Sequence, residues 1–157
     1  SERLIDSLEK AKLYNLPSYQ TLQPEYNLYD RQQFEEFLQP VADKYELGVI
    51  PYYSLASGFL SGKYKNEEDL KQSVRGEGIK KYLNERGFRI LEAINTIATQ
   101  YQISYAAVSL AWLMEQKSVV APIASATKEK HLDAFLEAVN VQLSHDDLKL
   151  LSEASEY

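Results

Sequence analysis

The sequence predicts an α/β fold in which short parallel strands alternate with crossover helices. Two apolar runs, Val49-Ile50 and residues 119–123, are typical of buried parallel strands. Longer stretches around them carry apolar residues at helical spacing. The resulting order is helix, strand, helix, strand, helix pair, strand, helix pair. Such alternation indicates a parallel sheet, of which three strands are visible.

Length and composition exclude several classes of function. The 157 residues favour one domain, and 45% of them are hydrophobic. The chain has no cysteine, so disulfide and thiolate chemistry are excluded. With a net charge of −6 and mixed signs, no basic stripe for nucleic acid or membrane is evident. We expect a cytoplasmic protein. Because it opens on Ser1 without Met, we expect a processed product or a piece of a longer chain.

The first third of the chain is expected to form two helices around one short strand. Residues 1–14 carry one apolar face, and residues 19–22 alternate as a strand does. Pro24 prevents a central strand from continuing. Asp30 is the expected cap of the next helix, which Pro40 should kink or split. The residues expected to be buried in these helices are Leu4, Ile5, Leu8, Ala11, Phe34, Phe37, Leu38 and Val41.

Residues 48–64 indicate a ligand site at the carboxyl end of a strand. The loop after the strand consists of small residues and ends at Lys63, which suits a phosphate near the backbone. Tyr52 offers a flat face at the strand exit. The spacing is not that of a Walker loop, because three residues rather than four separate Gly58 from Gly62. The alternative is an ordinary turn with a surface lysine.

The rest of the chain is expected to be mainly helical. The charged residues 65–85 indicate a long loop at the same end of the fold, either functional or merely solvated. Helices are expected over 87–101 and 104–116, from about residue 129, and after Ser144, with Asp147 as its first-turn partner. The residues expected to point inward are Ile90, Leu91, Ile94, Ile97, Ala98, Ala107, Val108, Ala111, Trp112, Leu132, Phe135, Leu136 and Val139.

Three strand exits carry a resemblance to a known family. They are Gln23-Pro24-Glu25-Tyr26-Asn27, then residues 51–58 with Gly62-Lys63-Tyr64, then residues 121–127. In this order, and with the helical tract 104–113, they resemble the aldo-keto reductase family. The resemblance implies a (β/α)₈ TIM barrel that reduces carbonyls with NADPH bound at its C-terminal face. The match covers the second half, so residues 1–157 are expected to be one partial domain.

The resemblance also implies a cofactor site. Gln23 would hydrogen-bond the nicotinamide carboxamide, and Tyr52 would stack on the nicotinamide ring. The pyrophosphate would be lined by Leu55, Ser57, Gly58, Leu60, Gly62 and Lys63. The adenosine and its 2′-phosphate would be approached by Ser125, Thr127, Lys128 and His131. Lys128 near a helix N-terminus favours NADP over NAD.

The chain departs from the family pattern at several positions. Tyr53 stands where many members have Ser, and Ser54 where many have Pro. Ser125 replaces a frequent Gly, Phe135 replaces an Asn that touches adenine, and His131 replaces Arg or Gln. The family's catalytic tetrad of Asp, Tyr, Lys and His belongs to the first half of the barrel. No catalytic residue is therefore assigned here, and no metal site is expected.

Two functions remain open. The chain is the cofactor-binding half of an NADP(H)-dependent reductase that converts carbonyls to alcohols, or it is a non-catalytic NADP(H)-binding or interaction module. Alone it is expected to be inactive. Three strands cannot close a barrel, and the inward faces of Val49, Ile50, Val119 and Val120 would be bare. We therefore expect a partner, either the missing N-terminal half or a second copy of the chain, besides a small carbonyl substrate.

Overall fold

Three extended segments run parallel through the computed structural model. Strand β1 (Thr21–Leu22) pairs with β2 (Gly48–Val49), with Thr21 opposite Gly48 and Leu22 opposite Val49. A parallel bridge joins Val49 to Val119. The structure describes residues 1–64, 68–69 and 76–157. The predicted parallel pairing is thus present in the described part of the chain, although the strands are short.

Backbone hydrogen bonds extend the ladder beyond the two strands. The N–H groups of Gly48 and Ile50 donate to the carbonyls of Gln20 and Leu22, at 3.0 and 2.9 Å. On the other side of β2, Val49 donates to Ser118 at 2.8 Å and accepts from Val120 at 2.9 Å. Because all three segments run in the same direction, their carboxyl ends meet at one edge.

The first helices confirm most of the expected pattern. They are α1 (Glu2–Leu13), α2 (Gln32–Phe37) and α3 (Gln39–Lys44). Pro40 lies in the first turn of α3, so the expected break is real. Two expectations were wrong. Asp30 does not cap α2, because its carboxylate accepts hydrogen bonds from Tyr82 and Lys81, and Phe37 is 50% exposed.

The charged stretch after Lys63 is only partly a loop. Residues 65–67 and 70–75 of the expected excursion lie outside the described residues. Its last part forms α4 (Gly76–Ile79) and the 3₁₀ helix η3 (Lys80–Tyr82), in which Ile79 and Tyr82 are buried. Helix α5 (Glu85–Tyr101) follows, capped by Asn84, whose side chain accepts from the Gly87 N–H at 3.0 Å.

Helix α6 lies at the centre of the helical part of the molecule. It spans Tyr105–Met114 and is buried almost all round, which explains its uniformly apolar sequence. Helices α7 (Lys130–Asn140) and α8 (His145–Ala154) complete the chain. The predicted Ser144 cap is confirmed as a reciprocal capping box with Asp147.

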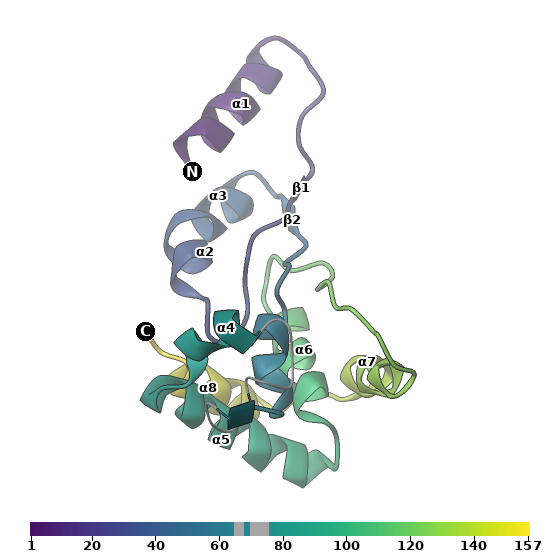
Figure 1. Cartoon of the computed structure of the whole chain (residues 1–157). Coiled ribbons are helices and arrows are strands. Elements are labelled where there is room, and N and C mark those ends of the chain that lie inside the picture. The colour runs from purple at the N-terminus through teal and green to yellow at the C-terminus, as the bar shows by residue number, and fades with distance from the viewer. Residues whose placement is uncertain (65–67, 70–75) are drawn as a thin grey trace.

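Most of the core is a single apolar cluster. It joins α5, α6 and α8 to β2 and the loop after it, and its largest fully buried side chains include Trp112, Tyr26, Tyr64, Phe34 and Phe59. Figure 1 shows the consequence for the shape: α5, α6 and α8 gather at one end, while α1 stands beyond β1 and β2 at the other. None of the described helices combines the length and apolar character that a membrane crossing requires.

The face of α7 and the third strand correct two sequence expectations. Residues 119–123 are not a buried strand, because Val120 is 64% and Ile123 is 40% exposed. Helix α7 instead buries Ala134 and Ala138. Its larger apolar side chains Leu132, Leu136 and Val139 are 49%, 62% and 65% exposed. The reason is that α7 packs on α6 through its small residues. Val49, in contrast, is fully buried rather than bare.

Candidate functional site

The three strand exits singled out in the sequence meet at one edge of the ladder. The Tyr52 N–H donates to the Pro24 carbonyl at 2.9 Å, and the Ile123 N–H donates to the Pro51 carbonyl at 2.9 Å. Glu25 and Tyr52 also form a parallel bridge. The segments 23–27, 51–64 and 121–131 therefore start side by side, at the end of a parallel sheet where ligands bind in α/β folds.

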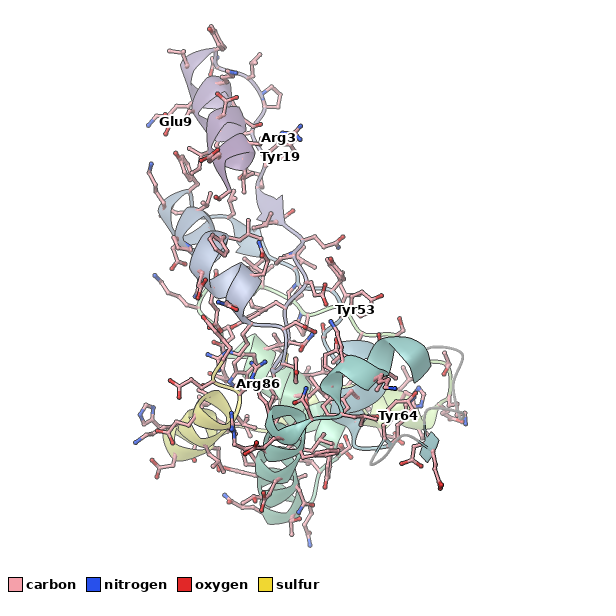
Figure 2. All side chains as sticks on the ribbon, turned by 60° about the vertical axis from the view of Figure 1, so that its left-hand side comes forward. Arg3, Glu9, Tyr19, Tyr53, Tyr64 and Arg86 are labelled. Atoms are coloured by element: carbon pink, nitrogen blue, oxygen red, sulfur yellow. The ribbon has the colours of Figure 1, made fainter. Side chains whose placement is uncertain are left out.

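Tyrosine rings mark the first part of this edge. Gln23 is exposed. Tyr52 is 38% exposed and lies beside Tyr53, with ring centroids 5.3 Å apart and planes tilted by 54°. In Figure 2, Tyr53 lies between the part that carries α1 to α3 and the lower group of helices. Aromatic faces that remain open at a strand exit are suited to stacking against a planar ring.

The loop after β2 has an unusual backbone. Tyr53, Ala56 and Ser57 have φ angles of 57°, 47° and 56°, in the left-handed region that side chains disfavour. Gly58 follows with φ of 94°. Short hydrogen bonds close the turns, from Ala56 N–H to Tyr53 at 2.7 Å and from Gly58 N–H to Leu55 at 2.8 Å. Strained backbone of this kind clusters at ligand sites and persists only where neighbours enforce it.

Lys63 lies over this loop. Its Nζ is 4.8 Å from the centroid of the Tyr64 ring, an arrangement that attracts the ammonium to the ring face. A Cβ added to Gly58 would lie 3.1 Å from the same Nζ, so the missing side chain leaves room for the lysine. Within the described residues, Lys63 forms no ion pair. Its ammonium therefore lies directly beside the Gly58 backbone.

Other residues of the predicted pyrophosphate lining have different surroundings. Leu60 is fully buried in the main core, so only its backbone can face a ligand. Leu55 packs with Ala124 against a second, smaller apolar cluster. At Gly62, with φ of 75°, an added Cβ would lie 2.6 Å from the Tyr105 ring. Glycine is required there because α6 begins directly against the loop.

The predicted adenosine side is more open. Ser125, Thr127 and Lys128 are all exposed, and α7 begins two residues after Lys128. The Thr127 N–H donates to Nδ1 of His131 at 3.3 Å, so the imidazole closes this turn. Among the described residues, hydrogen bonds join this group internally but do not tie it to the loop 52–63. Phe135 packs into the second cluster.

A group of acid and tyrosine side chains flanks the exit of β1. The Tyr82 hydroxyl donates to Asp30 at 2.6 Å, and Lys81 lies 3.2 Å from Asp30 and 3.9 Å from Glu25. Burial and the nearby Asp30 raise the pKa of Glu25. Burial, with Asp30 as a second cause, also raises the pKa of Tyr82 well above its usual range. Tyr82 therefore holds its hydroxyl proton more tightly than an ordinary tyrosine does.

Three further tyrosines also have raised pKa values. Burial and the neighbouring Glu35, 2.8 Å from its hydroxyl, raise the pKa of Tyr26. The pKa values of Tyr101 and Tyr157 are raised as well, by a hydrogen bond to Asp147 in the first and chiefly by burial in the second. A proton donor in carbonyl reduction needs a lowered pKa. These four tyrosines do not provide it.

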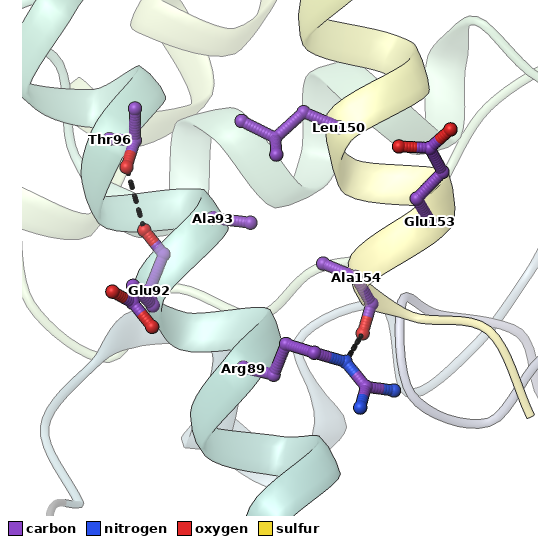
Figure 3. Close-up of a pocket in the computed structure, with 7 residues that line it drawn as sticks. All are labelled: Arg89, Glu92, Ala93, Thr96, Leu150, Glu153 and Ala154. Atoms are coloured by element: carbon purple, nitrogen blue, oxygen red, sulfur yellow. Dashed lines mark hydrogen bonds between the residues drawn. The ribbon is translucent and has the colours of Figure 1, made fainter.

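A separate groove lies between α5 and α8, as Figure 3 shows. It encloses about 400 Å³ and is lined by Arg89, Glu92, Ala93, Thr96, Leu150, Glu153 and Ala154. Arg89 donates from Nε to the Ala154 carbonyl at 2.9 Å, which satisfies a terminal carbonyl of α8. The groove contains none of the predicted cofactor residues, so it is distinct from the candidate site.

Two residues that organise the site carried no predicted role. Asn27 is fully buried and bonds to the Tyr53 carbonyl at 3.1 Å, and Tyr64 supports Lys63. Both stood inside the segments that carried the resemblance. The available signal for the first was a polar Asn inside a strand-exit segment, since a buried Asn must satisfy four hydrogen-bonding positions.

Known proteins are similar to this chain in sequence. The model of the aldo/keto reductase family matches residues 1–156. A probable aldo-keto reductase of Glycine max is 32% identical over 98% of this chain and 44% of its own length. A probable voltage-gated potassium channel subunit beta of Oryza sativa subsp. japonica is 32% identical over 76% of this chain and 38% of its own length. The "aldo-keto reductase yakc" of Schizosaccharomyces pombe, whose name specifies NADP(+), is 32% identical over 68% and 32%.

Proposed function

The chain belongs to the aldo-keto reductase family, and we propose that it is the cofactor-binding part of an NADP(H)-dependent reductase of small carbonyl compounds. It spans less than half the length of the relatives described above. The observation that carries the proposal is the convergence of Tyr52, Lys63 and the segment 121–131 at one edge of the parallel ladder.

The residues at this edge fit NADP(H). Tyr52 is partly exposed and would stack on the nicotinamide ring. Gln23 is exposed and directly precedes Pro24, whose carbonyl accepts from the Tyr52 N–H, and it would bond to the carboxamide. The pyrophosphate fits against the backbone of Ser57 and Gly58, where the Lys63 ammonium lies without a carboxylate among the described residues. Opposite charge and a close-approach glycine are the features that phosphate binding requires.

Lys128 supports the choice of NADP over NAD. It is exposed and lies just before the N-terminus of α7, an end that favours negative charge. The 2′-phosphate distinguishes NADP from NAD, so Lys128 would supply its charge partner. Ser125, Thr127 and His131 surround the same turn. The bound cofactor would supply a hydride, and the residues of this chain would bind and orient the cofactor.

The proton for the carbonyl oxygen is proposed to come from outside these 157 residues. The shifted tyrosines of the chain hold their protons more tightly than usual. Chain segments equivalent to the missing half of the barrel would supply the family's catalytic tetrad and cover the bare faces of the third strand and α7. We propose that this half, and not a second copy, is the partner, because six strands from two copies do not make an eight-stranded barrel.

A non-catalytic NADP(H)-binding subunit is the second candidate. The similarity to the rice channel subunit beta favours it. Both candidates use the same cofactor site, but the binding subunit would not reduce a carbonyl substrate.

Complementation separates the two candidates. The purified chain is mixed with the N-terminal half of a family member, and NADPH oxidation is followed with an aldehyde substrate. The reductase proposal predicts turnover by the mixture and none by the chain alone. A complex that forms and binds NADPH without oxidising it would contradict the reductase proposal and favour the binding subunit.

A further inference from the structure

A single buried side chain connects the two segments that would hold the nicotinamide. Asn27 follows β1 and is fully buried. Its Oδ1 accepts from the N–H groups of Tyr29 and Asp30 at 2.8 and 2.9 Å. Its Nδ2 donates to the Tyr53 carbonyl at 3.1 Å and to Asp30 Oδ2 at 3.2 Å. All four hydrogen-bonding positions of the amide are thus used.

The bond to Tyr53 acts on a strained part of the backbone. Tyr53 has φ of 57°, which costs energy for a residue with a side chain. Its carbonyl receives two hydrogen bonds, from Asn27 Nδ2 and from the Ala56 N–H at 2.7 Å. Asn27 therefore helps to enforce the direction in which the chain leaves β2.

The same turn fixes the neighbouring Tyr52. The Tyr52 N–H donates to Pro24 at 2.9 Å, and its carbonyl accepts from the Tyr26 N–H at 3.3 Å. The backbone of Tyr52 is therefore held by the segment that contains Gln23, and the next peptide is held by Asn27. The relative placement of Gln23, Tyr52 and the loop to Gly62 depends on this set of bonds.

We infer that Asn27 is a positioning residue, which holds the exits of β1 and β2 in register for the nicotinamide end of the cofactor. This inference rests on the proposed function, since it assigns the nicotinamide to Gln23 and Tyr52. Asn27 touches neither the cofactor nor the reacting atoms. It acts through the Tyr53 carbonyl, and its loss would misplace the nicotinamide contacts while the adenosine turn at 125–131 stays in place.

The test compares two ligands on matched variants of the whole chain. NADPH covers the full proposed site, whereas 2′,5′-ADP lacks the nicotinamide. Asn27→Asp keeps the acceptor for the Tyr29 and Asp30 N–H groups. It removes the donor to the Tyr53 carbonyl and to the Asp30 carboxylate. Asn84→Asp is the control on an exposed side chain. Asn84 also accepts a backbone N–H, from Gly87, and it donates to the Lys81 carbonyl at 2.8 Å and to the Tyr29 hydroxyl at 2.7 Å. None of those partners belongs to the loop after β2.

We expect Asn27→Asp to weaken NADPH binding by about tenfold or more, because the buried hydrogen bond to the Tyr53 carbonyl is lost and a carboxylate faces Asp30. Binding of 2′,5′-ADP should be unchanged, and Asn84→Asp should change neither. The fluorescence of bound NADPH at saturation should fall in Asn27→Asp, since it reports the nicotinamide surroundings. Circular dichroism checks folding, and Asn27→Ser removes the amide donor without adding a charge if Asn27→Asp does not fold.

The outcomes separate the inference from the proposed function. If the unmodified chain does not bind NADPH saturably, the proposed function fails and the inference fails with it. If it binds, but Asn27→Asp and Asn27→Ser weaken both ligands equally or neither, the inference alone is overturned and Asn27 has only a structural role.

Discussion

Tyr64 combines a useful ring with a costly hydroxyl. The ring is fully buried beneath the Lys63 ammonium, but the hydroxyl has no hydrogen-bond partner among the described residues. An unsatisfied buried polar group costs free energy, whereas the attraction of the ammonium needs only the ring. Tyr64→Phe keeps the second interaction and removes the cost of the first.

We therefore predict that Tyr64→Phe raises the free energy of unfolding by about 1 kcal/mol, measured by urea denaturation. NADPH affinity should stay unchanged, because Lys63 keeps its aromatic support. Tyr82→Phe is the matched comparison: it also deletes a buried tyrosine hydroxyl, but one that donates to Asp30 at 2.6 Å, so it should destabilise the chain. A loss of stability in Tyr64→Phe would show that its hydroxyl has a partner.

Individual residues also show where sequence reasoning ends. Ser144 was predicted as a cap because its partner Asp147 lies three residues on, within the same turn. Asp30 looked equally suitable, but its carboxylate bonds to Tyr82, which is 52 residues away. Asn27 likewise acts through Tyr53, 26 residues away. Local chemistry is readable in sequence, whereas long-range hydrogen bonds depend on how the chain folds.

At the scale of elements, the capping box of α8 makes stability depend on pH. Burial alone would raise the pKa of Asp147, but hydrogen bonds from the Ser144 and Tyr101 hydroxyls and from the Ser144 N–H outweigh it and hold the pKa below its usual value. Since the folded pKa is depressed, the contribution is present above the unfolded value of about 4 and is lost as pH falls through the folded pKa.

We predict that Asp147→Asn lowers stability at pH 7 by about 1 kcal/mol, the usual value of such a cap, and reduces the loss of stability on acidification. Thermal unfolding measured between pH 7 and pH 2.5 checks both effects. Asp146→Asn is the control, because Asp146 lies in the same first turn but is exposed. Equal pH profiles for the two variants would rule out the role given to the capping box.

The elements differ in how well sequence predicted them. Helices α1 and α5 followed their apolar periodicity, α8 followed its Ser144 cap, and α6 is apolar and buried almost all round. Helix α7 has an equally clear apolar stripe, yet Leu132, Leu136 and Val139 are largely exposed. The pattern predicted that these residues need a partner surface. It could not show that the described residues of this chain leave that surface uncovered.

For the molecule as a whole, one continuous stretch of chain carries five large exposed apolar residues, which are Val120, Ile123, Leu132, Leu136 and Val139. Val120 and Ile123 belong to the third extended segment, and the stripe of α7 follows directly. That segment pairs with β2 on one side only, within the described residues. An unpaired strand edge next to an apolar helix face is suited to association with further polypeptide. The proposed missing half of the barrel would cover this apolar surface and would also supply the catalytic residues that the cofactor site needs.

The most direct test of the account is native mass spectrometry of the purified chain, with NADPH or NADH added. We predict that species containing the 18.0 kDa chain gain the mass of one NADPH per chain. NADH should add little, because it lacks the phosphate that Lys128 would bind. Species free of added cofactor at saturating NADPH, from a chain shown to be folded, would contradict the assignment of the three strand exits as an NADP(H) site.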